Sequence, residues 1–408
     1  MIVLLYRIFN GIYYLGAKLA SGWNQKAALW VEGRKETWEK IAGADIRGCV
    51  WFHVSSLGEF EQARPLIEKI KQHHPNQKIA VSFFSPSGYE IRKNFPLVDL
   101  VFYLPIDTKA NAERMIKLLQ PKKVIWVKYD FWYFMLREIH ENNIPNILIC
   151  GNFRKDQLFF KWYGRFYRNM LTYFTRIFVQ NAVSVELLNG IGIPAHIAFD
   201  TRFDRVEAGR VQFKKNEFID EFIGNHMMIV FGSTWTEDDV IISKAIDHLD
   251  KQFPNLKYIV APHDIHSARI EETLDIYKNA LKYSTKDQFL EQRILIIDNI
   301  GMLSSLYAQA SIAYVGGGFG KSVHNVLEPA VYGIPVIFGP NYFKSMEAIE
   351  LVELKGCFTI QTAEALTEKI SNLLTSPEAL SKSSIINRKY IEERLGGTEI
   401  ILQYVESI

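Results

Sequence analysis

The segment Ser311–Pro340 carries the densest group of residues that could bind a ligand. Its sequence predicts a buried strand, a glycine loop, a helix that opens on His324 and Asn325, and a second strand. Four glycines leave backbone N–H groups of the loop unobstructed: Gly316, Gly317, Gly318 and Gly320. The predicted helix start adds further N–H groups and the positive end of a dipole, so the segment suits a phosphate group.

A carboxylate follows on the same predicted helix. Glu328 comes four residues after His324, so one face of the helix would carry both side chains, one turn apart. A carboxylate there could accept two hydroxyl hydrogen bonds from a ribose. Lys321, inside the loop, is a further candidate contact for the phosphate. The segment therefore predicts a nucleotide at the carboxyl edge of a parallel sheet, where open α/β folds bind ligands.

A second group of polar residues, between His53 and Glu59, ends the first predicted strand. Gly58 allows a tight turn, which places Glu59 at the start of a helix on the carboxyl edge of the sheet. A carboxylate at that position can act as a general base. The alternative is a glutamate that only complements the helix dipole, and spacing alone favours that alternative.

Two strand ends in the second half carry further candidates. Ser233 and Thr234 form either a second phosphate cradle or a plain helix cap. Pro262 and His263 follow the next strand. A metal is conceivable from three side chains of this stretch: His263, Asp264 and His266. No further ligand cluster is visible in the sequence, so backbone-guided contact with a nucleobase is favoured over a metal.

The remaining candidates lie on strand ends of the first half. Lys128 could meet an anionic substrate, and Asp130 could cap the helix that follows. Arg154 comes just after the next predicted strand. These three residues are expected on the same sheet edge as Glu59.

Short apolar runs alternate with helical patterns, and these elements must position the candidates. Seven runs lie between residues 49 and 199: CVWFHV, KIAVSFF, LVFYL, KVIWV, NILIC, RIFVQ and HIAF. Six lie between residues 227 and 360: MMIVF, KYIVA, RILIID, SIAYV, PVIF and CFTI. Strands that each precede a helix form parallel sheets with crossovers. The chain is therefore predicted to be an α/β protein with two doubly wound, Rossmann-like domains and a cleft between them.

The length and composition agree with this organisation. A chain of 408 residues is too long for one ordinary core and suits two domains. A net charge of +2 is too small to argue for a nucleic acid partner. The three cysteines lie far apart and give no disulfide framework, which fits a reducing cytoplasm. The predicted parts are an N-terminal helix over 1–25, a first domain over 26–205, a polar linker region over 206–225, a second domain over 226–380 and a helical tail over 381–408 that packs back on the first domain.

The N-terminal segment is apolar and aromatic, with only Arg7 and Lys18 charged among its first 20 residues. It lacks a small-residue cleavage site, so a removable signal peptide is not expected. It is at the lower limit for a spanning helix, and Arg7 would then lie inside the bilayer. The favoured prediction is an interfacial helix with four aromatic side chains near the headgroups: Tyr6, Tyr13, Tyr14 and Trp23. The alternative is a helix packed on the protein's own core.

Taken together, these motifs resemble bacterial 3-deoxy-D-manno-octulosonic acid (Kdo) transferases, over nearly the whole chain. The motifs occur in the family's order: Ser56-Leu57-Gly58-Glu59, Gly232-Ser233-Thr234, Ala261-Pro262-His263, and His324-Asn325-Val326-Leu327-Glu328-Pro329-Ala330 through Gly339-Pro340-Asn341-Tyr342-Phe343. The combination is specific, whereas either the glutamate-bearing helix or the Ser-x-Gly-Glu motif alone would be weak.

The resemblance implies a GT-B fold and transfer of Kdo from CMP-Kdo to a lipid A precursor, with inversion and without a metal or other cofactor. It implies acceptor binding by the first half, where Glu59 resembles the general base, and donor binding by the second. The implied donor contacts are Ser233, Thr234, Pro262, His263, Gly316, Gly317, Gly318, Lys321, His324, Asn325 and Glu328. The implied acceptor side comprises Ser56, Gly58, Lys128, Asp130 and Arg154. The implied location is the cytoplasmic face of the inner membrane, in contact with the membrane surface.

Two departures from the family pattern stand out. Family members often have Pro-Arg-His where this chain has Pro262-His263-Asp264, so an arginine contact for the donor is absent. Many members have Glu-Thr-Glu where this chain has Lys128-Tyr129-Asp130. The alternatives are another GT-B nucleotide-sugar enzyme, such as a UDP-sugar transferase or an epimerase, and a non-catalytic nucleotide-binding protein of the membrane surface.

Overall fold

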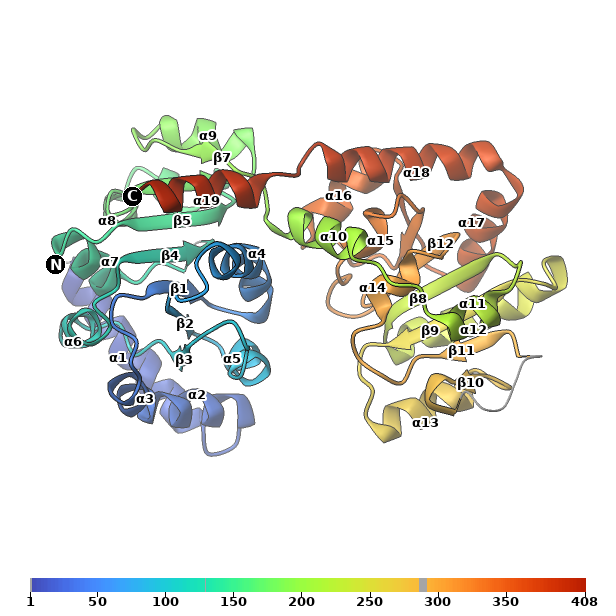
Figure 1. Ribbon diagram of the computed structural model, residues 1–408, viewed down its shortest axis with the longest axis horizontal. Helices are drawn as coiled ribbons and strands as arrows, with labels where there is room; N and C mark the ends of the chain where they lie inside the picture. The colour runs from blue at the N-terminus through green and yellow to red at the C-terminus, as the bar shows by residue number, and fades with distance from the viewer. Residues whose placement is uncertain (1, 129, 286–291) are drawn as a thin grey trace. The chain divides into compact units, whose positions relative to one another are not determined.

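The computed structural model describes residues 2–128, 130–285 and 292–408. The chain forms two compact units, one comprising 1–204 with 395–408 and the other comprising 205–394. Each unit is built on one seven-stranded parallel sheet with helices on both faces (Figure 1).

The first unit contains a sheet with the strand order β3-β2-β1-β4-β5-β6-β7. Its strands are β1 (Val50–Val54), β2 (Ile79–Phe83), β3 (Leu100–Tyr103), β4 (Lys123–Val127), β5 (Asn146–Gly151), β6 (Arg176–Val179) and β7 (His196–Ile197). All seven predicted apolar runs form these strands. The strand order reverses between β1 and β4, and such a switch point is where doubly wound sheets bind ligands.

The helices of the first unit cover both faces of this sheet. They are α1 (Ile2–Ala20), α2 (Gln25–Lys35), α3 (Thr37–Gly43), α4 (Leu57–His73), α5 (Pro86–Arg92), α6 (Lys109–Leu119), α7 (Tyr133–Glu141), the short 3₁₀ helix η1 (Leu158–Phe160), α8 (Arg165–Leu171), α9 (Ala182–Asn189) and α19 (Gly397–Ser407).

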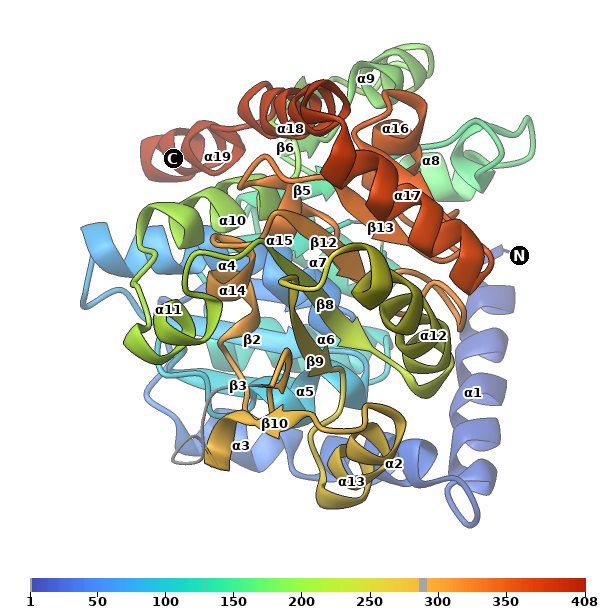
Figure 2. The same ribbon diagram turned by 90° about the vertical axis from the view of Figure 1, so that its right-hand side faces the viewer.

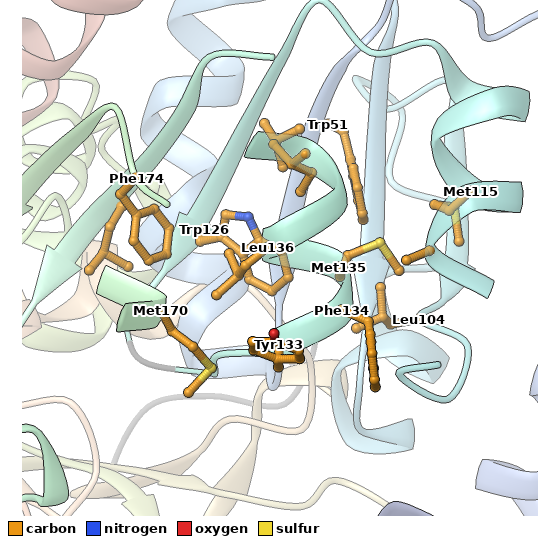
Figure 3. Packing of buried hydrophobic residues seen from close by; sticks show 14 of the residues in the cluster. Trp51, Leu104, Met115, Trp126, Tyr133, Phe134, Met135, Leu136, Met170 and Phe174 are labelled. Carbon is orange, nitrogen blue, oxygen red and sulfur yellow. The ribbon is translucent and has the colours of Figure 1, made fainter. Parts of the chain in front are cut away.

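Alternate side chains of the central strands enter two separate cores, because successive residues of a strand point to opposite faces. Trp51 and Trp126 pack with α6, α7 and α8 on one face, where Met115, Leu136 and Met170 close around them (Figure 3). On the other face, Val50, Phe52 and Val54 pack with α4 and α19. Burial of both faces makes the sheet a rigid support for the residues that follow each strand.

The second unit repeats the plan with the strand order β10-β11-β9-β8-β12-β13-β14. Its strands are β8 (Met228–Thr234), β9 (Lys257–Pro262), β10 (Leu281–Lys282), β11 (Ile294–Ile296), β12 (Ile312–Val315), β13 (Val336–Phe338) and β14 (Cys357–Thr359). The sequence missed only β10, a two-residue edge strand without an apolar run. Here the order reverses between β8 and β12.

The helices of the second unit include two in the region predicted as a linker. They are α10 (Arg202–Val211), α11 (Glu217–Ile223), α12 (Thr236–Gln252), α13 (Ser267–Ile276), η2 (Tyr283–Thr285), α14 (Leu303–Tyr307), α15 (Leu327–Ala330), α16 (Met346–Glu353), α17 (Ala363–Thr375) and α18 (Pro377–Glu392). α10 crosses the division between the units. Ile219 and Phe222 of α11 are buried in a core of the second unit, so residues 206–225 are not a polar linker.

The helical tail also divides differently from the prediction. α18 belongs to the second unit, and the chain returns to the first unit at Leu395. α19 then packs on α4, with Ile401, Leu402 and Val405 buried in the same core as Phe60. Residues 381–394 therefore belong to the second unit, and only α19 is part of the first.

Helix α1 runs along the outside of the first unit (Figures 1 and 2). One side of it is fastened by Tyr6, whose hydroxyl donates to Asp107 at 2.6 Å, and by Asn10, which donates to the Asp107 carbonyl at 3.1 Å. The prediction that Tyr6 lies among lipid headgroups is therefore wrong. Its other side exposes large apolar residues: Ile2, Leu4, Leu5, Ile8, Phe9, Ile12, Tyr13, Tyr14, Leu15 and Leu19. Among the described helices, none is both long and apolar enough to cross a membrane.

Candidate functional sites

Glu59 lies in the first turn of α4, just after the end of β1 and at the switch point of the first sheet. The backbone N–H of Ser55 donates to Oε2 of Glu59, which orients the carboxylate. The predicted tight turn at Gly58 is wrong, since Gly58 is inside α4 and an added Cβ would meet open space. Ser56 is the N-cap residue of α4, although its side chain makes no capping hydrogen bond.

Asp130 joins the same site from the end of β4. Its Oδ2 atom accepts from the Ser55 hydroxyl, from Nε1 of Trp132 at 3.1 Å and from the His53 ring at 3.2 Å. The prediction that Asp130 caps a helix is wrong, because α7 begins at Tyr133 with Trp132 as its N-cap residue. Ser55 therefore bridges the two carboxyl groups of the site, one through its backbone and one through its hydroxyl.

A buried chain of hydrogen bonds holds the His53 ring in place. Nε1 of Trp51 donates to Ser82 Oγ at 2.8 Å, and the same oxygen lies 2.9 Å from Nδ1 of His53. The Ser82 hydroxyl in turn donates to the Phe52 carbonyl at 3.4 Å. Nε2 of His53 carries a proton toward Asp130, because an ionised carboxylate can only accept.

The two carboxyl groups have opposite pKa shifts. Burial, assisted by the charge of Asp130, raises the pKa of Glu59 to about 7, although the Ser55 N–H and Lys128 act against the rise. Burial would also raise the pKa of Asp130, but the hydrogen bonds and charge of His53, with Ser55 and Trp132, hold it below its ordinary value. The site thus pairs a proton acceptor poised near neutral pH with a permanently ionised neighbour, a division typical of acid–base sites.

The other residues predicted on this edge differ in their relation to Glu59. Lys128 adopts a left-handed backbone conformation, with φ of 61°, and it lowers the pKa of Glu59 electrostatically. Within the described part of the chain, Lys128 has no ion pair. Arg154 is exposed, with its Nε atom 3.6 Å from Oδ1 of Asp156, and no contact joins Arg154 to Glu59. Tyr129 lies outside the described residues.

The second candidate site lies at the carboxyl ends of β8, β9 and β12 in the second unit, again at the switch point. Ser233 has a left-handed backbone, with φ of 54°, and Thr234 is fully buried. Pro262 pairs with Thr234 in the sheet, and the His263 N–H donates to the Thr234 carbonyl at 2.9 Å. These contacts bring the Ser-Thr and Pro-His motifs side by side.

The glycine loop is packed where a side chain would not fit. A Cβ on Gly318 would lie 2.6 Å from the backbone nitrogen of Gly339, and Gly317 has φ of 87°. The Gly317 N–H donates to Oδ2 of Asp238 at 2.9 Å. Within the described chain, four other loop N–H groups find no hydrogen-bond partner: those of Gly318, Phe319, Lys321 and Ser322. The loop therefore offers several backbone donors to an anion.

The predicted helix behind the loop is shorter than expected. α15 begins at Leu327, so His324 and Asn325 precede it and do not share a helix face with Glu328. Asn325 instead accepts from the Leu327 N–H at 3.2 Å and donates to Oε1 of Glu328 at 3.1 Å. A four-residue helix cannot supply the predicted dipole, so the loop N–H groups and Lys321 remain as the anion contacts.

Three aromatic rings stack beside this loop. The His263 and His324 centroids are 4.2 Å apart, and those of Trp235 and His263 are 4.7 Å apart. Nε1 of Trp235 donates to Nε2 of His324 at 2.9 Å. The sequence did not single out Trp235, although its place directly after the Ser-Thr pair was a usable signal. Asp238 was missed too; its buried carboxylate accepts from Trp235, Gly317 and Tyr314.

Among the described residues, no group of three or more His, Cys, Asp or Glu side chains could hold a metal ion. The arginine nearest in sequence to His263 is paired with carboxylates of the protein. Arg269 is buried and paired with Asp239 and Glu272. The positive charge of Arg269 is therefore balanced by these two carboxylates.

Comparisons with known proteins agree on one family. A sequence model described as 3-deoxy-D-manno-octulosonic-acid transferase (kdotransferase) matches residues 22–205. The transferase of that name from Aquifex aeolicus is 29% identical over 368 residues, covering 88% of this chain and 96% of the relative. The one from Haemophilus influenzae is 26% identical over 372 residues, covering 88% and 86%.

Solved structures show the same fold at lower identity. UDP-GlcNAc 2-epimerase from Neisseria meningitidis has a TM-score of 0.61 and 14% identity, covering 88% of this chain and all of that chain. MurG from Acinetobacter baumannii has a TM-score of 0.54 and 12% identity, with the same coverage. The prediction of two Rossmann-like domains of the GT-B type is confirmed.

Proposed function

Because the chain belongs to the 3-deoxy-D-manno-octulosonic acid transferase family, we propose that it transfers Kdo from CMP-Kdo to a lipid A precursor, with inversion at the anomeric carbon. The observation that carries the mechanism is the placement of Glu59 at the switch point of the first sheet, with its pKa raised to about 7. A carboxylate in that pKa range can accept a proton at neutral pH.

The transfer is a direct displacement. Glu59 accepts the proton of a sugar hydroxyl of the acceptor, and the oxygen bonds to the anomeric carbon of Kdo. The bond from that carbon to the CMP phosphate breaks, and CMP leaves with the electron pair. Asp130 stays ionised throughout, held by His53 and Ser55, and keeps the proton affinity of Glu59 high.

The second unit binds the leaving group. The unpaired N–H groups of the glycine loop and the exposed ammonium of Lys321 meet the CMP phosphate, a form of electrostatic stabilisation aimed at developing charge. Glu328, next to Asn325, accepts from the ribose hydroxyls. The nucleoside lies beside the paired ends of β8 and β9, at Ser233, Thr234, Pro262 and His263.

A lipid acceptor fits the surroundings of α1. A groove of about 570 Å³ runs between α1, α2 and the loop after β2, and its lining includes Ala17, Trp30 and Phe84. The N–H of Ser85, next to Phe84, donates to the Ser55 carbonyl at 2.8 Å, so the groove adjoins the Glu59 site. An acyl chain in this groove would leave the sugar of the acceptor near Glu59.

The exposed apolar side of α1 supports attachment to the cytoplasmic face of the inner membrane. Such a helix lies in the interface, with its apolar side chains in the acyl region and its axis along the surface. The protein is then peripheral, and it meets its lipid acceptor without extracting it from the bilayer.

The test is incubation of the purified protein with CMP-Kdo and a lipid A precursor, followed by mass analysis of the lipid and of the released nucleotide. We expect a lipid mass increased by one or more Kdo residues, with release of CMP. Loss of the base in Glu59→Gln should reduce turnover by about 10²–10⁴. An unchanged lipid mass, or near-normal turnover by folded Glu59→Gln, would contradict the proposal.

A further inference from the structure

A hydrogen bond from Trp235 determines which nitrogen of His324 carries a proton. Nε1 of Trp235 lies 2.9 Å from Nε2 of His324. An indole N–H can only donate, so Nε2 must accept and cannot itself be protonated. A neutral His324 therefore carries its proton on Nδ1.

The stacked rings keep His324 neutral. Burial, followed by the repulsion of a charge on His263, lowers the pKa of His324 to about 4, while Asp264 acts in the opposite direction. The ring planes of His263 and His324 are only 14° apart, so a charge on one ring would face the other directly. Protonation would also break the bond to Trp235, because both nitrogens of His324 would then be donors.

The Nδ1–H group of His324 faces no acceptor within the described part of the protein. His324 is half-buried and follows the glycine loop, where its own N–H donates to the Gly316 carbonyl at 3.0 Å. The His324 ring lies against Gly317 through Cδ2 and Nε2, so its unpaired Nδ1–H belongs to the same site as the unpaired loop N–H groups and is available to the anion bound there. Asp238 connects Trp235 to the loop, because its Oδ2 atom accepts from the backbone N–H of Trp235 at 3.0 Å and from the backbone N–H of Gly317 at 2.9 Å.

We infer that Trp235 is a positioning residue that holds His324 in its Nδ1–H form, so that His324 donates a hydrogen bond to an anionic oxygen of the bound sugar nucleotide. The identity of that ligand rests on the proposed function, whereas the protonated nitrogen does not. Two oxygens fit the chemistry: a phosphate oxygen of CMP and the carboxylate of Kdo.

The first test is nitrogen NMR of the full chain, labelled with ¹⁵N in its histidine rings. We expect the His324 signals, identified by their loss in His324→Asn, to show a proton on Nδ1. Trp235→Phe keeps an aromatic ring but loses the indole N–H. In this variant the signals should become those of a mixture of the Nδ1–H and Nε2–H forms of His324. A proton on Nε2 in the wild type would overturn the inference, whether or not the protein transfers Kdo.

The second test uses side-chain amides that mimic one ring nitrogen each. The amide of asparagine lies near the place of Nδ1, and that of glutamine near the place of Nε2. We expect His324→Gln to weaken binding of CMP-Kdo about tenfold, as for a lost hydrogen bond to a charged group, and His324→Asn to weaken it much less. Equal losses in the two variants, or a smaller loss in His324→Gln, would overturn the inference.

Binding is measured by calorimetry with CMP and with CMP-Kdo, so that it does not depend on turnover. A loss with both ligands locates the contact on the phosphate, and a loss with CMP-Kdo alone locates it on the carboxylate. Trp235→Phe should raise the KM for CMP-Kdo roughly two- to tenfold, because only part of the population keeps the competent form. Trp162→Phe, at a residue that is 90% exposed, is the matched control and should change neither the affinity for CMP-Kdo nor the KM. Failure of the wild type to bind CMP-Kdo would refute the proposed function but leave the NMR result intact.

Discussion

Nε2 of His53 lies 3.2 Å from Oδ2 of Asp130, and this pairing helps to keep Asp130 ionised beside Glu59. The negative charge of Asp130 in turn raises the pKa of Glu59, although burial contributes more. A proton acceptor and a fixed charge thus lie just after the ends of two adjacent strands, β1 and β4, and Ser55 makes a hydrogen bond to each.

Replacement of Asp130 should move the pH profile of the enzyme. In Asp130→Asn the fixed charge is lost, so the pKa of Glu59 should fall from about 7 and Glu59 should stay ionised at lower pH. The acidic limb of kcat/KM against pH should therefore move to lower pH. Because burial remains, the limb should still lie above the ordinary pKa of a glutamate. An unchanged limb would mean that Glu59 and Asp130 are not coupled.

Replacement of Lys128 should have the opposite effect. Its ammonium lowers the pKa of Glu59, so Lys128→Met should move the acidic limb to higher pH. At pH 6 the variant should then lose more activity than at pH 8, where Glu59 is ionised in both proteins. Arg154→Met is the matched control, because Arg154 is exposed and has no contact with Glu59. A limb that moves equally in both variants would point to a general charge effect.

The raised pKa of Glu59 also predicts a pH-dependent stability. An unfolded glutamate ionises near pH 4.5, whereas the folded one ionises only near pH 7, so the folded protein loses stability as pH rises between these values. Glu59→Gln should remove this loss. Its free energy of unfolding should match the wild type at pH 4 and exceed it at pH 8 by up to about 3 kcal/mol. Chemical denaturation at both pH values checks the difference, and a constant gap would contradict a raised pKa.

Most strands and their edge residues could be predicted because their apolar runs are buried on both faces; β7, whose two residues are exposed, is an exception. Glu59 and the glycine loop were found for that reason, since polar residues directly after such runs must lie at one sheet edge. The family resemblance carried by those motifs is also confirmed. β10 was missed because a two-residue edge strand needs no apolar run.

Hydrogen bonds between side chains of neighbouring strand ends could not be predicted from the sequence. Asp130 looked like a helix cap because it precedes α7, yet its carboxylate accepts from side chains of His53, Ser55 and Trp132. The helix at His324 was predicted from spacing, but the Asn325 side chain accepts from the Leu327 N–H, and α15 begins only at Leu327, with Val326 as its N-cap residue. Long-range hydrogen bonds from the neighbouring strand decided the first case, and a local side-chain hydrogen bond decided the second.

Substitution by alanine should have very different effects at two positions of the glycine loop. A Cβ on Gly318 would lie 2.6 Å from the backbone of Gly339, which cannot move aside, whereas a Cβ on Gly320 would lie 3.6 Å from the Gly317 carbonyl. We expect Gly318→Ala to lower the free energy of unfolding by about 1–3 kcal/mol and to weaken binding of CMP. Gly320→Ala is the matched control and should keep both within error. Equal behaviour of the two variants would show that the loop is not packed as described.

Membrane attachment should depend on the exposed side of α1. The exposed fractions of Leu5, Phe9 and Ile12 are 58%, 65% and 65%, so their replacement by serine costs no core packing. The triple variant should bind vesicles of anionic phospholipid at least about tenfold less well, because several apolar side chains no longer enter the bilayer. The control replaces three apolar residues of the second unit, each more than 60% exposed, by serine: Val211, Ile300 and Ile385. Flotation of all three proteins with the vesicles gives the comparison. Transfer to a short-chain, soluble acceptor should be unchanged in the α1 variant, and equal loss of vesicle binding in both triple variants would exclude α1 as the specific attachment site.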